Sequence, residues 1–245
     1  MENTIWISLL ILIVAFLYSS VGHGGASGYL AIMAVCGVAV AIMKPTALIL
    51  NIFVSLVAFI LFYKSGYFRW NLFWPFIIGS IPASFAGGLV TLDDSIFKKT
   101  LAIILIFPIL RLFGLFGKNN QTELKKINIP LAIVIGAAIG FLSGMMGIGG
   151  GIILSPVLLL FYWANMKETA AVSALFIFVN SISGLLGYIS KNEIQFTSDI
   201  ILFIVAGLLG GFLGSYIGSK KLNIVQLRIS LAIVLTIACF KLIIA

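Results

Sequence analysis

Two glycine-rich runs constrain the fold of this chain more than any other feature. Residues 22–28 read Gly-His-Gly-Gly-Ala-Ser-Gly, residues 147–151 read Gly-Ile-Gly-Gly-Gly, and each run interrupts a long apolar stretch. Glycine weakens a helix by about 1 kcal/mol per residue and allows backbone conformations that other residues avoid. In hydrocarbon, non-helical backbone is tolerated only where protein buries it or where it lines a watery cavity. The runs therefore predict two helix breaks inside a folded bundle.

Composition places this bundle in a lipid bilayer. Hydrophobic residues make up 62% of the chain, charged residues only 9%, and the mean hydropathy is +1.23. These values lie outside the range of soluble domains. A span needs about 20 residues, so the chain has room for about ten segments. The apolar runs are 4–21, 27–43, 45–63, 71–90, 95–116, 129–146, 150–165, 168–190, 198–218 and 223–244. This pattern predicts an all-α polytopic integral membrane protein of about eight to ten helices, with full or re-entrant, broken segments at the glycine runs.

The two halves of the chain resemble each other in order and spacing. Five apolar segments fall in each half, and the hydrophilic stretch Gly117–Asn128 separates them. We therefore expect a first repeat at residues 1–117, a polar linker at 118–128 and a second repeat at 129–245 within one transmembrane domain. Chance matching between apolar sequences is the alternative. The matched positions are Gly22, Gly24 and Gly25 with Gly147, Gly149 and Gly150; Lys44, Thr46 and Ala47 with Lys167, Thr169 and Ala170; and Gly79 with Gly207.

Basic residues indicate the orientation, because Lys and Arg gather in cytoplasmic loops. If the first two segments of each half leave and return to the same side, ten of the 15 basic residues share one face. If those two segments form a single broken span, the bias disappears. The first topology predicts inverted repeats with both termini outside the cytoplasm. The ten residues are Lys64, Arg69, Arg111, Lys118, Lys125, Lys126, Lys167, Lys220, Lys221 and Arg228.

The glycine breaks are also candidate anion sites. A helix that restarts at Ala26 or Gly151 presents free N–H groups and a positive dipole end, both of which favour anions. Close helix packing through small residues is the alternative explanation for the glycines. The candidate binding residues at the breaks are Gly22, His23, Gly24, Gly25, Ala26, Ser27, Gly147, Gly149, Gly150 and Gly151.

Five polar residues near these breaks have two possible roles each. His23 is the single histidine of the chain, and it either binds the anion or senses pH, or it holds the break in shape. Asn51 and Asn180 lie within predicted spans, where an amide contacts substrate or bonds neighbouring helices. Thr46 and Thr169 begin the third segment of each half, so we expect helix caps that could also contact substrate.

The chain resembles the TauE/SafE sulfite exporter family. The resemblance rests on Gly147, Gly149, Gly150, Gly151 and Pro156 in the second half and on the run Ser20–Leu30 in the first. It implies a polytopic inner-membrane permease of a bacterium for sulfite or organosulfonates such as sulfoacetate. The first half departs from the second by carrying Ala31 in place of the proline and His23 in place of Ile148, which leaves equivalent roles of the halves open.

The charge inventory also favours an exported anion. All seven acidic residues fall at segment ends or in loops, whereas proton relays and cation sites usually need a carboxylate within the membrane. An anion leaving an inside-negative cell gains about 2.3 kcal/mol per charge per 100 mV. We therefore expect a secondary transporter that exports a small sulfur-containing anion by alternating access around the two breaks. An anion channel and a non-transporting membrane subunit are the alternatives.

Few other functions fit the residues. One histidine and no carboxylate within the spans leave no catalytic group, so we expect no enzyme activity, no cofactor and no metal site. The expected partners are the anion and the bilayer, without nucleic acid, and homo-oligomerisation stays open. The net charge of +8 comes mainly from the loop bias and favours contact with anionic lipid.

Overall fold

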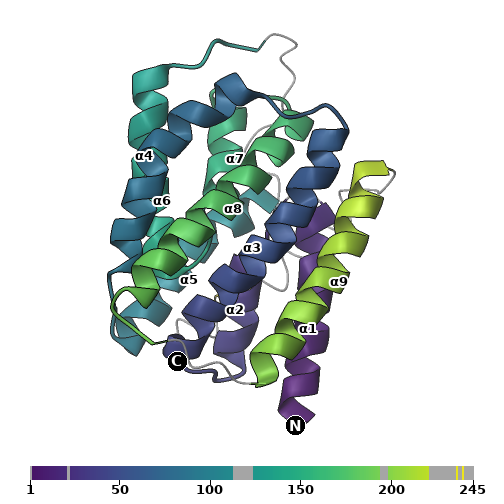
Figure 1. Cartoon of the computed structure of the whole chain (residues 1–245), viewed down its shortest axis with the longest axis vertical. Helices are drawn as coiled ribbons and strands as arrows, with labels where there is room; N and C mark the ends of the chain where they lie inside the picture. The colour runs from purple at the N-terminus through teal and green to yellow at the C-terminus, as the bar shows by residue number, and fades with distance from the viewer. Residues whose placement is uncertain are drawn as a thin grey trace.

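The chain forms a bundle of α-helices in the parts that the computed structural model describes, which are residues 2–20, 23–112, 124–193 and 198–220 with Thr236 and Cys239. Within these ranges, α3, α6, α8 and α9 are long and apolar enough to cross a membrane. The helices are α1 (Glu2–Ser20), α2 (Ala26–Val35), α3 (Val40–Lys64), α4 (Trp70–Gly88), α5 (Asp94–Leu112), α6 (Ile129–Met146), α7 (Gly151–Leu160), α8 (Met166–Ile189) and α9 (Ser198–Lys220) (Figure 1). The all-α polytopic fold is thus confirmed. The predicted segment 223–244 lies largely outside the described residues.

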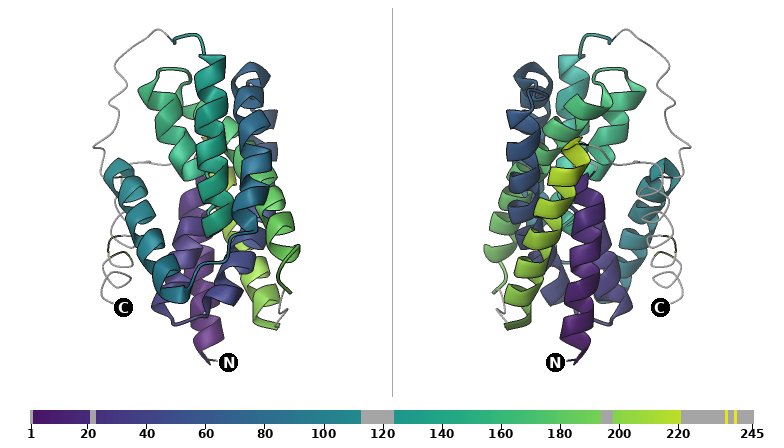
Figure 2. Two further views of the ribbon diagram at one scale, coloured as in Figure 1. Left: turned by 90° about the vertical axis from the view of Figure 1, so that its left-hand side faces the viewer. Right: turned by 90° about the vertical axis from the view of Figure 1, so that its right-hand side faces the viewer.

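The helices of the two halves run in opposite directions. Helix α1 rises from the lower end of the bundle to about its middle, and α2 returns to the lower end (Figures 1 and 2). Helix α6 descends from the upper end and α7 returns to it, so each pair enters and leaves on one side. Likewise α3 rises while α8 descends, and α4 descends while α9 rises. Both breaks therefore lie near mid-height, and the first two segments of each half form broken pairs.

The helix contacts follow the same exchange between the halves. Helix α4 packs along α6, and α9 packs along α1. Helices α3 and α8 cross at the centre, where α3 also contacts α9 and α8 contacts α4. If α1, α3 and α4 are exchanged with α6, α8 and α9, the α4–α6 contact becomes the α9–α1 contact, the α3–α9 contact becomes the α8–α4 contact, and the α3–α8 contact stays the same. This packing is what a duplicated, inverted pair of units would produce.

Small residues allow α4 and α6 to approach backbone to backbone. A Cβ added to Gly136, Gly140 or Gly144 of α6 would collide with a carbonyl oxygen of α4. The glycines recur every four residues, and so do the carbonyls that they face, which belong to Phe76, Ser80 and Ser84. In α9, Gly210 and Gly214 face the carbonyls of Leu12 and Phe16 in the same way. Such small-xxx-small rows drive association in lipid through close van der Waals contact.

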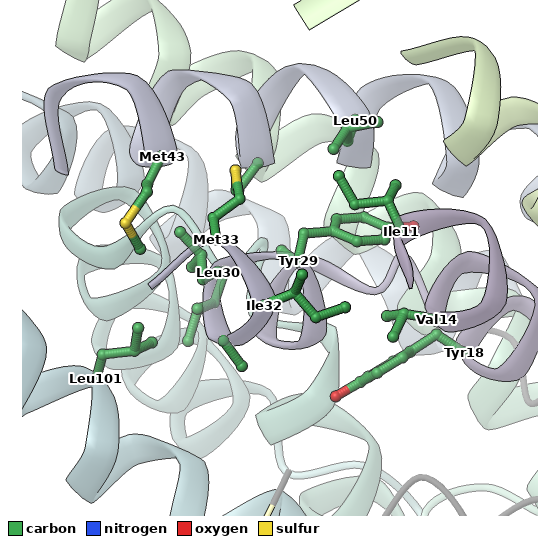
Figure 3. Close-up of a cluster of buried hydrophobic side chains, with 14 of the residues drawn as sticks. Ile11, Val14, Tyr18, Tyr29, Leu30, Ile32, Met33, Met43, Leu50 and Leu101 are labelled. Carbon is green, nitrogen blue, oxygen red and sulfur yellow. The ribbon is translucent and has the colours of Figure 1, made fainter. Parts of the chain in front are cut away.

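The short helices α2 and α7 are each enclosed by longer ones. Residues Ala26 to Met33 of α2 are all buried. Tyr29, Leu30, Ile32 and Met33 of α2 lie among Ile11, Val14 and Tyr18 of α1, Met43 and Leu50 of α3 and Leu101 of α5 (Figure 3). Around α7, Leu154 and Leu158 pack with Phe76 of α4, Ile139 of α6 and Phe176 of α8. Enclosure removes the starts of both short helices from lipid.

The boundary between α2 and α3 differs from the prediction. Helix α2 ends at Val35 rather than at residue 43, and α3 begins at Val40, so that Pro45 lies inside it. Proline has no N–H and leaves the carbonyl four residues earlier, at Ala41, without its helical donor. The hydroxyl of Tyr188 donates to that oxygen at 3.1 Å. A tertiary hydrogen bond thus allows α3 to continue through Pro45, where the sequence predicted that a segment begins.

Replacement of Gly140 by valine should separate α4 from α6. The added side chain meets the backbone of Ser80, which cannot move away as a side chain can. Overpacking typically costs about 1–3 kcal/mol, so the melting temperature of the purified protein in detergent should fall clearly. The control is Ala138→Val, which adds a similar group at an exposed position of the same helix. Equal melting temperatures of the two variants would contradict the described contact.

Candidate functional site

Both breaks end where a short helix begins on a left-handed glycine. Helix α2 starts at Ala26 after Gly25, whose φ is 93°, and α7 starts at Gly151 after Gly150, whose φ is 75°. These are the two restart positions predicted from the sequence. No side chain caps either helix. Because the first N–H groups of a helix have no acceptor within it, both starts carry free donors and a partial positive charge into the interior of the bundle.

Asn51 of α3 lies against both breaks. A Cβ added to Gly24 would lie 2.6 Å from Asn51 Oδ1, and one added to Gly149 would lie 2.5 Å from Asn51 Nδ2. Ile177 of α8 also adjoins both, at 3.0 Å from the Gly24 position and 2.7 Å from the Gly149 position. The two breaks, far apart in sequence, therefore meet at one amide. Any side chain at either glycine would displace it.

The polar atoms of this amide are buried without a protein partner. Asn51 is 0% exposed, and neither its Oδ1 nor its Nδ2 forms a hydrogen bond within the described parts of the chain. Ser181 Oγ, 3.1 Å from the Gly149 Cβ position, is likewise buried and unpaired there. An unsatisfied buried polar group costs about 1–3 kcal/mol, so such groups normally meet water or a ligand. Asn51 and Ser181 thus offer hydrogen bonds between the breaks.

His23 connects the first break to the second half of the chain. Its Nε2 lies 2.9 Å from Ser155 Oγ on α7, and the ring is buried. Ser155 Oγ in turn lies 2.8 Å from Ser173 Oγ on α8 and donates to the carbonyl of Gly151 at 2.9 Å. This chain of hydrogen bonds joins the first break, α7 and α8. These hydrogen bonds agree with the second role considered for His23, which is to hold the break in shape. They also place the ring beside the first turn of α7.

The remaining predicted residues of the breaks have local partners. The Ser27 hydroxyl lies 2.7 Å from that of Tyr18 on α1. A Cβ on Gly25 would lie 2.6 Å from the hydroxyl of Tyr29, which is buried. Gly151 faces the side chain of Ile177, while Ala26 is buried at the start of α2. The predicted site residue Gly22 lies outside the described residues.

Gly147 and Gly150 complete the second break. Both have left-handed backbone, with φ values of 77° and 75°, and Gly147 ends α6. A Cβ on Gly147 would lie 3.3 Å from Lys44 Cγ, whereas one on Gly150 would lie 2.8 Å from Ile139 Cγ2. These two glycines therefore face packed side chains rather than the Asn51 amide.

Asn180 forms its hydrogen bonds within α8 and with α4 rather than at the breaks. Its Nδ2 donates to the carbonyl of Phe176 at 2.8 Å, and its backbone carbonyl accepts a hydrogen bond from the hydroxyl of Ser84 on α4. Its Oδ1 is buried without a hydrogen bond in the described parts of the chain. The small face that follows it packs tightly, since Gly184 and Gly187 contact the backbone of α6 and α4, respectively.

The prediction that Thr46 and Thr169 cap their helices is wrong. Helix α3 begins at Val40, so Thr46 lies inside it. Helix α8 is capped by Asn165, which accepts bonds from the backbone N–H groups of Lys167 and Glu168, while the Glu168 side chain accepts one from Asn165 N. This capping box satisfies the donors that Thr169 was expected to bind. Both threonine hydroxyls are buried and have no partner among the described residues.

Ser155, Ser173, Ser181 and Lys44 were not identified as site residues from the sequence. Ser155 follows Gly151 by one helical turn, and Ser181 directly follows Asn180. Both could have been predicted from their closeness in sequence to these two candidate residues. Ser173 and Lys44 could not be found in this way, because their positions depend on the packing of α3, α7 and α8.

Comparisons with known proteins agree with this architecture. The sequence model of the sulfite exporter TauE/SafE family matches residues 7–242. A probable membrane transporter protein of Sinorhizobium fredii is 34% identical over 243 residues, which cover 98% of this chain and 98% of that protein. A probable membrane transporter protein of Methanocaldococcus jannaschii is 32% identical over 118 residues, 47% of this chain and 43% of that protein. No solved structure matches the chain.

The family match covers nearly the whole chain, and so does the alignment with the Sinorhizobium protein. Both agree with an apolar bundle whose helices are broken at the glycine runs that carry the resemblance. The chain belongs to the TauE/SafE family of multi-pass membrane transporters.

Proposed function

We propose that this transporter exports a small anion, sulfite or an organosulfonate, and binds it between the two glycine breaks. The observation that carries the proposal is the Asn51 amide, which is fully buried, contacts Gly24 and Gly149, and has no hydrogen-bond partner among the described residues. An oxyanion between the breaks would accept bonds from Asn51 Nδ2 and from the Ser181 hydroxyl. The family description supports the choice of sulfite.

Backbone N–H groups add further hydrogen-bond donors for an anion. Helices α2 and α7 both begin at the breaks without a side-chain cap, so their first N–H groups are available to an anion. The two helices belong to opposite halves of the chain, and from their starts near mid-height they run toward opposite ends of the bundle. A ligand between them would experience two positive dipole ends at once.

The placement of carboxylates supports an anion over a cation. Within the described parts of the chain, Asp93 and Asp94 are exposed at the start of α5, and Glu168 pairs with Arg69 at 3.4 Å beside the start of α8. A cation site within the membrane would need such groups near Asn51. The membrane potential alone can then drive an anion outward, without a coupling ion.

Alternating access follows from the arrangement of the halves. Residues 1–117 and 129–245 would act as two units joined by the linker 118–128, and rocking of one against the other would open the central site to each side in turn. The contacts of α4 with α6 and of α9 with α1 lie between the two repeats, and their exchange relation supports the inverted duplication on which such a motion rests.

Basic residues support an orientation with the upper end of the bundle in the cytoplasm of a bacterial cell. This end carries the last residue of α3, the residues before α4 and α6, and the start of α8. In this orientation the N-terminus is extracytoplasmic. The basic residues concerned are Lys64, Arg69, Lys125, Lys126 and Lys167.

Purified protein in liposomes should release enclosed sulfite or organosulfonate with saturable kinetics. Because one charge across 100 mV corresponds to about 2.3 kcal/mol, an inside-negative potential of that size should shift the final distribution of a monoanion about 50-fold outward. Efflux is measured at two clamped potentials, with protein-free liposomes as the control. Flux that rises linearly without saturation would indicate a channel instead, and no flux of any of these anions would indicate a non-transporting subunit.

Gly149→Ala should abolish transport while the protein still folds. The new methyl group forces strain at a φ of 71° and also displaces the Asn51 amide. Left-handed backbone costs a non-glycine residue about 1–2 kcal/mol. Gly66→Ala is the matched control, because Gly66 has a φ of 78° but nothing within 4 Å of its Cβ position. Both variants should melt at lowered temperatures, with the larger decrease in Gly149→Ala because its methyl group also displaces side chains. Only Gly149→Ala should lose efflux, and equal efflux of the two would refute the site.

A further inference from the structure

Lys44 places an ammonium group in the interior of the bundle. It lies in the second turn of α3, a helix long and apolar enough to cross a membrane, and it is only 4% exposed. Its Nζ donates to the carbonyls of Gly88 and Val90 at 3.3 and 3.0 Å, at the end of α4. The same nitrogen lies 5.3 Å from the ring centre of Tyr188 on α8.

No carboxylate compensates this group within the described parts of the chain. Its partners are two neutral carbonyls and an aromatic ring, and the ion pair described there joins Arg69 to Glu168 at the opposite end of the bundle. Asp93 and Asp94 follow Val90 closely in sequence, but they are exposed and form no ion pair with Lys44. Among the described residues no carboxylate thus lies within ion-pair distance of the ammonium, and charged groups inside membranes are costly and commonly functional.

Lys44 lies close enough to the breaks for its charge to act on an anion bound there. Lys44 precedes Asn51 by seven residues, which is two helical turns or about 10 Å on the same face of α3. Its aliphatic stem packs on Gly147, the first glycine of the second break, where Cγ lies 3.3 Å from the Cβ position. From Asn51, Lys44 lies toward the lower end of the bundle, where α3 begins.

We propose that Lys44 determines the charge selectivity of the transporter. Its field stabilises an anion at Asn51 and along the route toward the lower end of the bundle, and it favours a divalent anion over a monovalent one. This inference rests on the proposed function, since it assigns the anion to the space between the breaks. Lys44 acts through the field rather than by contact with the bound anion.

Coulomb's law gives the size of the expected effect. Two unit charges about 12 Å apart, slightly more than the backbone rise because Nζ reaches toward the end of α4, attract each other at an effective dielectric constant of about 20 enough to change an affinity about tenfold. A dianion at the same position experiences twice the interaction energy, which corresponds to about a hundredfold. Removal of the charge should therefore weaken the dianion about tenfold more than the monoanion. A purely structural role of Lys44 predicts no such difference.

The test compares two organosulfonates that differ by one charge, methanesulfonate and sulfoacetate. Half-saturating concentrations for efflux from liposomes are measured for the wild type, Lys44→Gln and Lys44→Arg. Glutamine keeps an N–H donor for the end of α4 but removes the charge, whereas arginine keeps the charge. In Lys44→Gln the concentration should rise about tenfold for methanesulfonate and about a hundredfold for sulfoacetate, and Lys44→Arg should retain the wild-type ratio.

Several outcomes would overturn the inference. Equal weakening of both anions in Lys44→Gln, together with a lower melting temperature, would mean that Lys44 only caps α4. An unchanged ratio in a stable variant would mean that its field does not reach the anion. Should Lys44→Gln fail to fold, Lys44→Met, which retains most of the stem that packs on Gly147, gives the same ratio test. If the wild-type protein moves no anion, the proposed function itself is wrong. If the wild type transports both anions and Lys44→Gln leaves the ratio of their half-saturating concentrations unchanged, only this inference is wrong.

Discussion

In lipid, every backbone N–H and carbonyl must find its partner inside the protein, and this requirement governs the whole structure. A helix may break within the bilayer only if other helices enclose the break. Here each break is followed by a short helix, α2 or α7, that longer helices surround. The arrangement of α1, α3 and α5 around α2, and of α4, α6 and α8 around α7, follows from the need to bury two interruptions.

Close packing makes that enclosure possible and also joins the two halves. Rows of glycine let α6 lie on the carbonyls of α4 and let α9 lie on those of α1. With the halves this close, Asn51 of the first half reaches Gly149 of the second, and His23 reaches Ser155. Helix packing through small residues, the alternative explanation of the glycines, therefore holds for many of them outside the breaks, while Gly24 and Gly149 at the breaks lie against the Asn51 amide.

Local signals were enough to predict much of this architecture from the sequence. Runs of apolar residues predicted the bounds of α6, and the glycines predicted the restarts at Ala26 and Gly151, because both depend on neighbouring residues. The start of α3 was missed because Tyr188, distant in sequence, supplies the donor that Pro45 lacks. The double contact of Asn51 and the burial of Lys44 depend on how separate helices pack, which residue spacing alone does not specify.

In the proposed transporter, the two breaks form one anion site around Asn51. Selenite has the shape and charge of sulfite, and selenium scatters X-rays anomalously, so a crystal of the transporter soaked in selenite tests the claim directly. We expect an anomalous peak within hydrogen-bonding distance of Asn51 Nδ2, between Gly24 and Gly149, that disappears in Gly149→Ala. A bound selenite far from both breaks, with none at Asn51, would contradict it.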